Sequence, residues 1–420
     1  MPSSPPGPPG FQPFRRNGLI EFPVHYIRGG TSTGLVLWKR FVPSDEALCE
    51  ELLRHLMGVP LTGSLPGNKQ ITGLGRGPAT SNKVFLADIE ATSGGVRLVS
   101  TLAQLASDHG EIDWSVNCGN MSAALPLWAS DMGFPNLVRQ GTWQLEISNT
   151  NTGVVTTARM TTQPDGRFSI ATIPGVDGAF PGVDLFLHDP VGSKTGRLLP
   201  TGSVEEIVAG YPVSCVDVAV PMVIVDAAAL GKTAHEPVRE LEADGEFMSS
   251  LRKIWVEAGL RMALRRRDGQ LMTAAELERS ETIPKICIVG APRAEGNIAV
   301  RYFTPQTGHA SMAVSGGCCL AAATLIPGTV AHRLARGVMT PGSVESDIEV
   351  GIENPAGTLD ATVIAHIEKG ALSIVTVACR RSAQILLRGH VPLYRASPSL
   401  FDALSHLAEH DTLNVPERLV

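Results

Sequence analysis

Cys118 is the residue of this sequence whose surroundings best suit proton chemistry. It lies in the segment NCGNMSAA, where glycine and small polar residues lead into an alanine-rich stretch typical of a helix start. Free backbone N–H groups and the positive end of the helix dipole stabilise a thiolate at such a place. A thiol/thiolate pair can then exchange protons with carbon acids near neutral pH. A small buried thiol is the competing interpretation, and the motif alone leaves both open.

The same helix start also predicts a carboxylate-binding site. The backbone N–H groups of Gly119 and Asn120 would hold the anion, with Asn117 beside them.

Lys83 is the second candidate for acid–base chemistry. It ends the glycine-rich loop GLGRGPATSN and begins an apolar run typical of a buried strand. Partial desolvation at such a position lowers the pKa of an ammonium group and makes a neutral amine available as a base. A surface lysine at a strand end is the alternative. The loop matches neither of the common phosphate-binding glycine patterns.

A third candidate segment is RGGTSTG, residues 28–34, which follows the first predicted strand. Consecutive glycines allow backbone N–H groups to converge on an anion, and Thr31 and Ser32 add hydroxyl donors. Arg28 could hold a carboxylate through two parallel hydrogen bonds. A tight glycine turn without a ligand fits the same letters.

The second half of the chain offers His309, Ser315 and Gly316, which precede or begin another alanine-rich helix. We expect them to line the site, although a lone histidine near a helix start is more often structural. Two further segments are predicted as connections: a turn at Asn149–Gly153, and a loop at Gly192–Gly202 whose basic residues either are solvated or face an anionic ligand.

Short β-branched or alternating runs bounded by Gly, Pro, Asn or Asp predict many strands. The predicted strands are Phe22–Arg28, Leu35–Trp38, Lys83–Asp88, Val96–Leu105, Trp143–Ser148, Val154–Thr162, Arg167–Ile173, Val213–Val220, Met222–Val225, Lys285–Val289, Ile298–Phe303, Asp347–Ile352, Leu359–His366 and Leu372–Ala378. The predicted helices are Ser44–Met57, Cys118–Asp131, Val204–Ala209, Glu236–Arg266 and Met312–Leu325. The pattern indicates an α+β or α/β protein with much antiparallel sheet.

NCGNMSAA and SGGCCLAA stand about 200 residues apart and share the same progression from small polar residues to an alanine-rich helix. This internal similarity predicts two related lobes, residues 20–200 and 205–395, joined by a Gly/Pro/Ser/Lys-rich linker at 189–202. The last strand would cross back to the first lobe. Residues 1–19 are predicted to be a disordered Pro/Gly tail, and 396–420 a C-terminal helix or tail. Two unrelated alanine-rich helices are the alternative.

Composition excludes several classes of function. The net charge is −6 and the basic residues are spread along 420 residues, which argues against a nucleic-acid partner. The seven cysteines are irregularly spaced and form no CxxC pair, so neither a disulfide framework nor a zinc site is expected. A reducing, cytoplasmic location fits best. The chain lacks a long apolar run, so no membrane span is expected. The oligomeric state is left open, and a homodimer is compatible with the sequence.

Taken in order, the motifs RGGTSTG, GLGRGPATSNK, NCGNMSAA, SNTNTG, GSKTGRLLPTG, PKICIVG, HASMAVSGG and RRSAQILLRG resemble the PrpF-like family over residues 22–394. That family includes 2-methylaconitate cis–trans isomerase and relatives acting on methylitaconate, aconitate and 4-oxalomesaconate. The resemblance implies a diaminopimelate-epimerase-like fold: two pseudo-symmetric lobes, each wrapping a sheet around a central helix, with the site between them. It also implies that Cys118 and Lys83 are the acid–base pair and that no cofactor takes part.

Two departures from the family pattern concern the substrate. Thr33 stands where many relatives carry a lysine or arginine, and Arg76 where they carry a glycine. The amino-acid epimerases of this fold use two facing cysteines, whereas the second position here corresponds to Ser315 or Gly316.

We therefore expect a 1,3-proton shift on an unsaturated polycarboxylate such as aconitate or 2-methylaconitate, without metal. An amino-acid epimerase, a non-catalytic polycarboxylate-binding protein and, more weakly, a cysteine hydrolase using Cys118 and His309 are the alternatives.

Overall fold

The computed structural model describes residues 11–77, 81–92, 95–115, 118–134, 140–266, 268–280 and 282–412. The chain forms two compact units. The first comprises Met1–Thr172, Gly178–Val183 and Arg381–Val420, and the second comprises Ile173–Asp177 and Asp184–Arg380. The chain enters the second unit briefly at Ile173–Asp177, crosses again within strand β10 (Phe180–His188), and returns within the long strand β19 (Ala371–Pro392).

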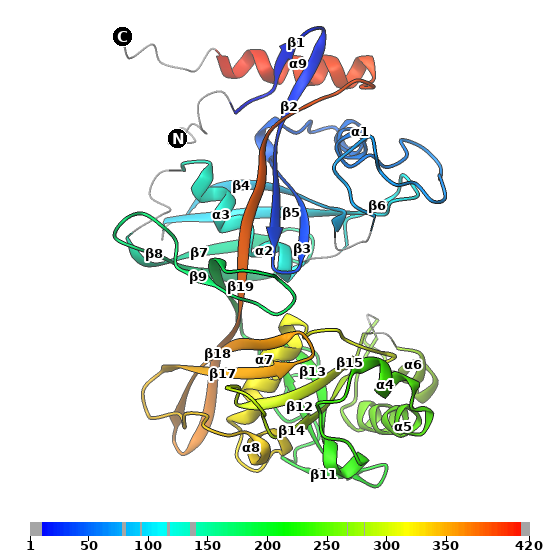
Figure 1. Cartoon of the computed structure of the whole chain (residues 1–420), viewed down its shortest axis with the longest axis vertical. Helices are drawn as coiled ribbons and strands as arrows, with labels where there is room; N and C mark the ends of the chain where they lie inside the picture. Colours follow the sequence, from blue (N-terminus) through cyan, green and yellow to red (C-terminus); the bar gives the residue numbers. More distant parts are fainter. Residues whose placement is uncertain are drawn as a thin grey trace. The chain divides into compact units, whose positions relative to one another are not determined.

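The first unit holds most of the elements that position the predicted acid–base pair (Figure 1). Its elements are β1 (Phe14–Arg16), β2 (Leu19–Gly29), β3 (Ser32–Trp38), η1 (Lys39–Phe41), α1 (Glu46–Met57), β4 (Lys83–Thr92), β5 (Gly95–Leu105), β6 (Ile112–Asp113), α2 (Gly119–Ser122), α3 (Leu125–Asp131), β7 (Gly141–Asn149), β8 (Val155–Thr162), β9 (Ile170–Ala171) and α9 (Pro398–Thr412).

The second unit repeats this kind of arrangement with longer helices between its strands (Figure 1). Its elements are β11 (Glu206–Val208), β12 (Tyr211–Val218), β13 (Val220–Asp226), η3 (Ala227–Leu230), α4 (Val238–Ala243), α5 (Gly245–Arg261), α6 (Ala274–Arg279), β14 (Lys285–Gly290), β15 (Ile298–Thr304), β16 (Thr307–Gly308), α7 (Val314–Thr324), α8 (Val330–Leu334), β17 (Ser346–Asn354) and β18 (Gly357–Glu368).

The two units share one order of strand pairing. In the first, β2–β3, β4–β5 and β7–β8 pair antiparallel, while β3–β4 and β5–β7 pair parallel. In the second, β12–β13, β14–β15 and β17–β18 pair antiparallel, while β13–β14 and β15–β17 pair parallel. Helices α2 and α3 lie between β5 and β7 in the chain, as α7 and α8 lie between β15 and β17. The internal repeat inferred from the two alanine-rich helix starts is therefore present in the topology.

The paired strands of the second unit carry apolar side chains on both faces, and each face packs in a different core cluster. Cys287, Val289 and Tyr302 pack in one core cluster with the buried helix α7. Ile286, Ile288 and Phe303 pack in another with α5. Side chains alternate between the faces of a strand, so odd and even residues of β14 go to different helices. This alternation decides where the first residue of each strand points.

Helix α1 shows how local sequence sets its ends. Asp45 accepts a hydrogen bond from the backbone N–H of Leu48 at 3.0 Å, and Gly58 ends the helix in the left-handed conformation with φ of 68°. The leucines between these ends, at 52, 53 and 56, are fully buried. The helix therefore anchors the loop that follows it and leads to Lys83.

Several predictions about organisation need correction. Residues 1–10 of the predicted tail lie outside the described residues, but 11–19 include β1, which pairs with β2. The predicted linker at 189–202 belongs to the second unit and is not the boundary. Val204–Ala209 forms the short strand β11 rather than a helix, because it pairs with β12. The predicted helix Glu236–Arg266 is interrupted at Asp244, whose backbone is extended.

The strand predictions were right for most elements, and the differences lie in their extents. Arg167–Ile173 contributes only the two-residue strand β9, and β10 was not predicted. Leu372–Ala378 is the first part of β19, which continues to Pro392 and pairs with β18 and then with β2. Within the described residues, none of the helices is both long and apolar enough to cross a membrane.

Candidate active site

Lys83 is the first residue of β4 and lies between two paired strands. Its partners across the sheet are Gly34 on β3 and Gln104 on β5. A Cβ atom at Gly34 would lie 2.4 Å from the carbonyl oxygen of Lys83, so only glycine allows β3 to come this close. The backbone of Lys83 is thus held on both sides. The residue is buried, with 7% of its surface exposed.

The glycine-rich loop before Lys83 is organised by two buried amides. Asn82 donates from Nδ2 to Gln70 Oε1 at 3.0 Å and to the Gly77 carbonyl at 3.1 Å, while its Oδ1 accepts from the backbone N–H of Arg76 at 3.1 Å. Gln70 donates to the Met57 carbonyl at the end of α1, at 2.9 Å. The loop is therefore anchored both to α1 and to the residue next to Lys83. Sequence reasoning missed Gln70 and Asn82.

Cys118 lies just before α2, at its N-cap, with an extended backbone. It is partly exposed, whereas the other six cysteines of the chain are buried. Lys83 and Cys118 are within electrostatic reach of each other. Burial lowers the pKa of Lys83, and the nearby charge of a Cys118 thiolate acts in the opposite direction without cancelling the effect. The structure brings the two predicted acid–base residues together.

The glycine turn after β2 packs directly on the start of α2. A Cβ atom at Gly29 would lie 2.5 Å from the Asn120 carbonyl oxygen, and one at Gly30 would lie 2.4 Å from Asn120 Oδ1. Gly30 also has a φ of 53°. Asn120 donates from Nδ2 to Thr31 Oγ1 at 3.2 Å. The RGGTS turn and the helix start therefore form one surface, which carries Thr31, Gly119 and Asn120; Ser32 is buried beneath it. Asn117 lies outside the described residues.

Arg28 faces away from this surface. Gly29 contacts α2, so its neighbour Arg28 lies on the opposite face of β2. The Arg28 guanidinium donates from Nη1 to the carbonyls of Gly30 and Ser382, at 2.8 and 3.1 Å, and lies 4.6 Å from the centre of the Phe180 ring. Burial lowers the pKa of Arg28. The structure gives Arg28 a role in holding the glycine turn, and its role as a carboxylate clamp stays a prediction.

The predicted turn Asn149–Gly153 also supports the site. Asn151 donates to the carbonyls of Leu102 and Trp114, at 2.9 and 2.7 Å, and accepts from the Leu102 N–H at 2.7 Å. Trp114 lies on the segment that leads to Cys118. The turn therefore ties that segment to β5, whose Gln104 is the neighbour of Lys83.

The second unit contains His309, Ser315 and Gly316. The His309 ring lies 5.9 Å from the Tyr302 ring, and its Nδ1 accepts a hydrogen bond from the Ser311 N–H at 3.0 Å. Ser315 and Gly316 belong to the first turn of α7. Their sharing of one site with Cys118 stays a prediction. Cys318 and Cys319 are fully buried farther along α7.

The loop Gly192–Gly202 surrounds a buried carboxylate of the protein itself. Asp217, with no exposed surface, accepts hydrogen bonds from Ser193 Oγ at 2.6 Å, from the backbone N–H of Lys194 at 2.9 Å and from that of Thr195 at 2.8 Å. These donors are a hydroxyl and backbone N–H groups, so the alternatives for the basic side chains of the loop, solvated or facing an anionic ligand, stay open.

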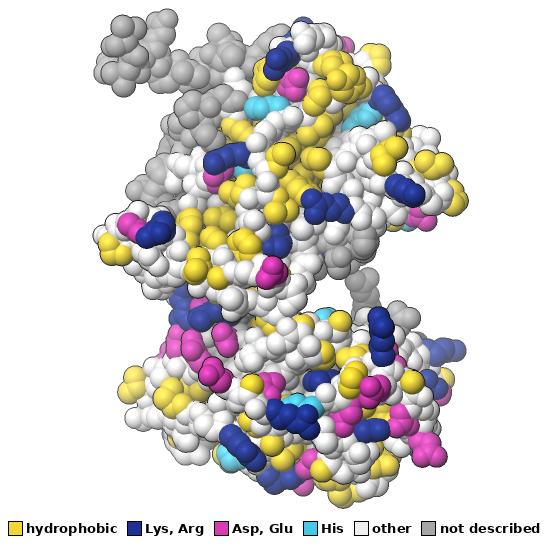
Figure 2. Space-filling view, viewed as in Figure 1, with side chains coloured by type: hydrophobic (Ala, Val, Ile, Leu, Met, Phe, Trp, Pro, Cys, Tyr) yellow, Lys and Arg dark blue, Asp and Glu magenta, His cyan; other side chains and the backbone are white. Residues whose placement is uncertain are grey.

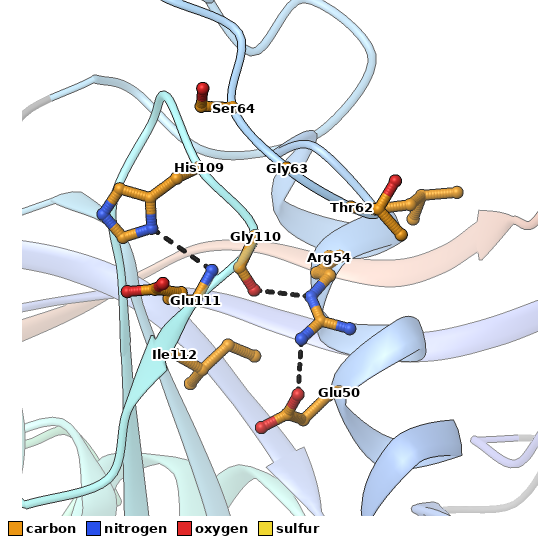
Figure 3. A pocket seen from close by; sticks show the side chains of 10 residues that line it. Glu50, Arg54, Thr62, Gly63, Ser64, His109, Gly110, Glu111 and Ile112 are labelled. Atoms are coloured by element: carbon orange, nitrogen blue, oxygen red, sulfur yellow. Dashed lines mark hydrogen bonds and ion pairs between the residues drawn. The ribbon is translucent and has the colours of Figure 1, made fainter.

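A cavity of the first unit lies apart from these residues. It measures about 930 Å³ and lies between α1 and the loops 61–64 and 109–112 (Figure 3). Arg54 donates to the Gly110 carbonyl at 2.7 Å and pairs with Glu50, so its charge is already balanced. A second cavity of about 430 Å³ is bordered by Gly77 and Gln104, which adjoin Asn82 and Lys83. Gln104 is the strand partner of Lys83, so this second cavity lies next to the strand start that carries the buried amine.

No group of three or more His, Cys, Asp and Glu side chains in the described part of the chain is arranged to hold a metal ion. On the face seen in Figure 2, basic and acidic side chains are interspersed. A buried lysine beside an accessible thiol, next to backbone N–H groups of a glycine turn and a helix start, can remove a proton from a carbon acid and return it elsewhere.

The relatives that this chain matches along most of its length are named isomerases, and this places the chain among the isomerases. The family model described as "PrpF protein" matches residues 19–394, and the chain belongs to the PrpF family. The resemblance inferred from the sequence motifs is confirmed.

Two relatives and one solved structure illustrate the relationship. The chain is 32% identical to 4-oxalomesaconate tautomerase of Pseudomonas putida, over 90% of this chain and 98% of that protein. It is 27% identical to 3-methylitaconate isomerase of Eubacterium barkeri, over 90% of this chain and 98% of that protein. The crystal structure of methylitaconate-delta-isomerase superposes with a TM-score of 0.74 and 24% identity, covering 89% of this chain and 96% of that one. The predicted α+β fold is therefore confirmed as the fold of that isomerase.

Proposed function

We propose that this isomerase catalyses a 1,3-proton shift on an unsaturated polycarboxylate, using Lys83 and Cys118 and no cofactor. Aconitate and 2-methylaconitate are the substrates we favour, and the class includes 4-oxalomesaconate and 3-methylitaconate, after which the relatives are named. The predicted cytoplasmic location remains part of this proposal.

The observation that carries the proposal is the pairing of a desolvated amine with the one accessible thiol. Burial lowers the pKa of Lys83, so a larger fraction of the amine is neutral and able to accept a proton. Cys118 is partly exposed to solvent, whereas the other six cysteines are buried. Two groups that exchange protons therefore stand beside each other without further machinery.

In the proposed mechanism one member of the pair removes a proton from the carbon that lies next to both the alkene and a carboxylate. The electron pair of that C–H bond moves into a dienolate, and the double bond shifts by one position. A proton then returns to the far carbon of the allylic system, so the reaction has no net gain or loss of atoms or electrons. Backbone N–H groups of the glycine turn and of Gly119 and Asn120 would stabilise the enolate oxygen.

The rate contributions expected from the acid–base residues and the backbone N–H donors suffice for catalysis without a metal. A positioned acid or base contributes about 10²–10⁴-fold in rate. One enolate-stabilising donor contributes about 10²–10³-fold. Because these contributions come from side chains and backbone of the protein, we propose that neither metal nor flavin is required.

An amino-acid epimerase remains the second candidate because such enzymes share this fold. It would need a second thiol in the position that corresponds to Cys118. In the second unit the N-cap residue equivalent to Cys118 is Ala313, not Ser315 or Gly316 as the sequence predicted, and the two cysteines of α7 are fully buried. This arrangement favours the 1,3-shift. A non-catalytic binding protein would have no use for the lowered pKa of Lys83.

The test is proton NMR in D₂O with cis-aconitate, 2-methylaconitate, 4-oxalomesaconate and 3-methylitaconate in parallel tubes. We expect one tube to show a shifted double bond with deuterium at the new C–H position. Unchanged spectra in all tubes, with the acids still bound, would favour the binding-protein alternative. An α-amino acid that exchanges its α-proton would favour the epimerase.

Substitutions with matched controls test whether Cys118 and Lys83 take part in the reaction. Cys118→Ala and Lys83→Met should each lower turnover by about 10²-fold or more. The controls are Cys49→Ala on α1 and Lys39→Met on the exposed turn η1, which should retain activity. Full turnover by Cys118→Ala would remove Cys118 from the mechanism.

A further inference from the structure

Two buried cysteines of the second unit touch each other. The sulfur atoms of Cys318 on α7 and Cys379 on β19 lie 3.4 Å apart, although the two residues are 61 positions apart in the chain. Neither residue has any exposed surface. Both are free thiols, and the proposed mechanism uses neither of them. They are therefore a pair of oxidisable groups outside the proposed reaction.

Hydrogen bonds fix the direction of both thiols. Cys379 Sγ donates its hydrogen to the carbonyl oxygen of Val314, in the first turn of α7, at 3.3 Å. A thiol has a single hydrogen, so Cys318 is the donor and Cys379 the acceptor in the contact between the two sulfur atoms. The two side chains therefore point at each other across the space between the helix and the strand.

Gly317 makes room for this contact. A Cβ atom at Gly317 would lie 3.1 Å from Cys379 Sγ and 3.0 Å from a methyl carbon of Leu359 on β18. Because glycine has no side chain, α7 comes close enough to these strands for Cys318 to reach β19. The close approach of the backbone is thus a condition of the sulfur contact.

The neighbouring cysteine of α7 is placed differently. Cys319 is as fully buried as Cys318 and belongs to the same hydrophobic cluster. Its thiol, however, donates to the Val216 carbonyl oxygen on β12 at 3.6 Å. Two adjacent thiols with the same burial thus have different partners, one a second sulfur and the other a backbone oxygen.

A disulfide between Cys318 and Cys379 requires only a small movement. The two sulfur atoms would approach from 3.4 Å to about 2.05 Å, the length of a disulfide bond. A change of this size is what rotation of two side chains produces, because the helix and the strand already hold the thiols face to face.

We propose that Cys318 and Cys379 are a site of reversible oxidation, at which hydrogen peroxide forms a disulfide that ties α7 to β19. In the first step one thiol sulfur bonds to a peroxide oxygen, the O–O bond breaks, and a sulfenic acid and water form. The second sulfur then bonds to the first, the S–O bond breaks, and the oxygen leaves as a second water. The peroxide gains the two electrons that the thiols lose.

The bond would lock the second unit at the strand that leaves it. Cys379 lies two residues before Arg381, where the chain passes into the first unit. The disulfide closes a covalent loop across the 61 positions between the cysteines. Such a cross-link restricts the unfolded chain, and the effect increases with the length of the loop. The oxidised protein should therefore unfold at a higher temperature than the reduced one.

Peptide mass spectrometry without reduction tests for the bond. The reduced full-length protein is exposed to hydrogen peroxide, and the remaining thiols are then blocked in denaturant. We expect a linked peptide pair that contains Cys318 and Cys379 and that dithiothreitol separates. Oxidation of the partly exposed Cys118 shows that the peroxide has acted. Absence of the linked pair after full oxidation of Cys118 would overturn the proposal.

Two alanine variants distinguish the adjacent cysteines of α7. Cys318→Ala should abolish the linked pair, whereas Cys319→Ala, at an equally buried position, should keep it. A link that persists in Cys318→Ala, or that is missing from a folded Cys319→Ala protein, would overturn the assignment. If a variant does not fold, fragmentation of the wild-type linked peptides between residues 318 and 319 decides which sulfur is bonded.

Thermal unfolding measures what the bond does. Cys118→Ala is the background, so that oxidation of Cys118 does not contribute. Its Tm should be about 5 °C higher after oxidation, and dithiothreitol should remove the difference. Addition of Cys318→Ala should abolish the shift. A linked protein with an unchanged or lower Tm would contradict the locking of α7. Because no readout involves the substrate, the result is independent of the proposed function.

Discussion

Asn82 donates a hydrogen bond to Gln70 across 3.0 Å, and this contact joins two residues that are otherwise 12 positions apart. Both side chains are almost fully buried, with 0% and 1% exposed. Because Lys83 directly follows Asn82, the contact couples the loop after α1 to the proposed catalytic amine.

Asn82→Ala should lower turnover and change the pH dependence. The substitution removes three hydrogen bonds and leaves the Gly77 carbonyl and the Arg76 N–H without their partner. We expect a loss of about 1–3 kcal/mol in the free energy of unfolding. We also expect water to reach Lys83, which would raise its lowered pKa toward the usual value. The rise of kcat with pH, caused by deprotonation of Lys83, would then occur at higher pH.

Denaturant unfolding and the pH–rate profile check this prediction. Asn297→Ala in the second unit is the control, because Asn297 also bonds two backbone groups, Arg336 O and Gly351 N, at 2.8 and 2.7 Å. It should lose stability without moving the pH profile. A profile that is identical in wild type and Asn82→Ala would contradict a positioning role for Asn82.

Gly34→Ala should separate β3 from β4 at Lys83. The added Cβ would lie 2.4 Å from the Lys83 carbonyl oxygen, a distance at which the backbone itself must move. A displacement of this size at a catalytic group costs about 10²-fold in rate. Gly245→Ala is the matched control, because a Cβ there meets nothing within 4 Å. Steady-state kinetics and thermal unfolding of both variants would test the prediction, and normal kcat in Gly34→Ala would refute it.

The sequence predicted the elements that carry the site better than it predicted what holds them in place. The helix starts at Cys118 and before Ser315, and the strand start at Lys83, follow from local patterns of glycine, small polar residues and apolar runs. Those patterns depend on neighbouring residues in the chain. Cys118 and Lys83 could therefore be singled out as candidates from local motifs, while their pairing as acid and base came from the family resemblance.

The contacts that position the site are long-range, and this is why they were missed. Gln70 and Asn82 look like ordinary polar loop residues, and Asn151 looks like part of a turn, until the fold places them beside backbone carbonyls. The same limit applies to Gly192–Gly202. Its backbone N–H groups bind Asp217, which follows the loop in the chain and lies beside it through β12, and no local pattern indicated this contact. The direction of Arg28 depends on the contact between Gly29 and α2.

Alkylation should modify Cys118 before any other cysteine. Cys118 is partly exposed while the other six are buried, so iodoacetamide at neutral pH should modify Cys118 well before any other thiol. Peptide mass spectrometry would identify the site, and activity should fall in step with its modification. A substrate acid added beforehand should slow the reaction. Labelling of Cys49 or Cys379 at the same rate would contradict the accessibility on which the proposed mechanism depends.

Stability should depend on pH through Lys285. Its pKa is about 8 in the folded protein and would return to the usual value of about 10.5 on unfolding. The unfolded state therefore binds more protons between these values, and the contribution of Lys285 to stability rises with pH across this window. Below about pH 8 both states carry the charge, and its burial cost is fully present.

Lys285→Met removes that cost, because the neutral side chain has nothing to desolvate. The variant should gain stability relative to wild type at pH 7, and the gain should shrink as the pH approaches 9.5. Thermal unfolding from pH 7 to 9.5 measures this difference in Tm. Lys253→Met, at an exposed position, is the control and should show a constant difference. A gain for Lys285→Met that is independent of pH would mean that Lys285 is not desolvated in the folded protein.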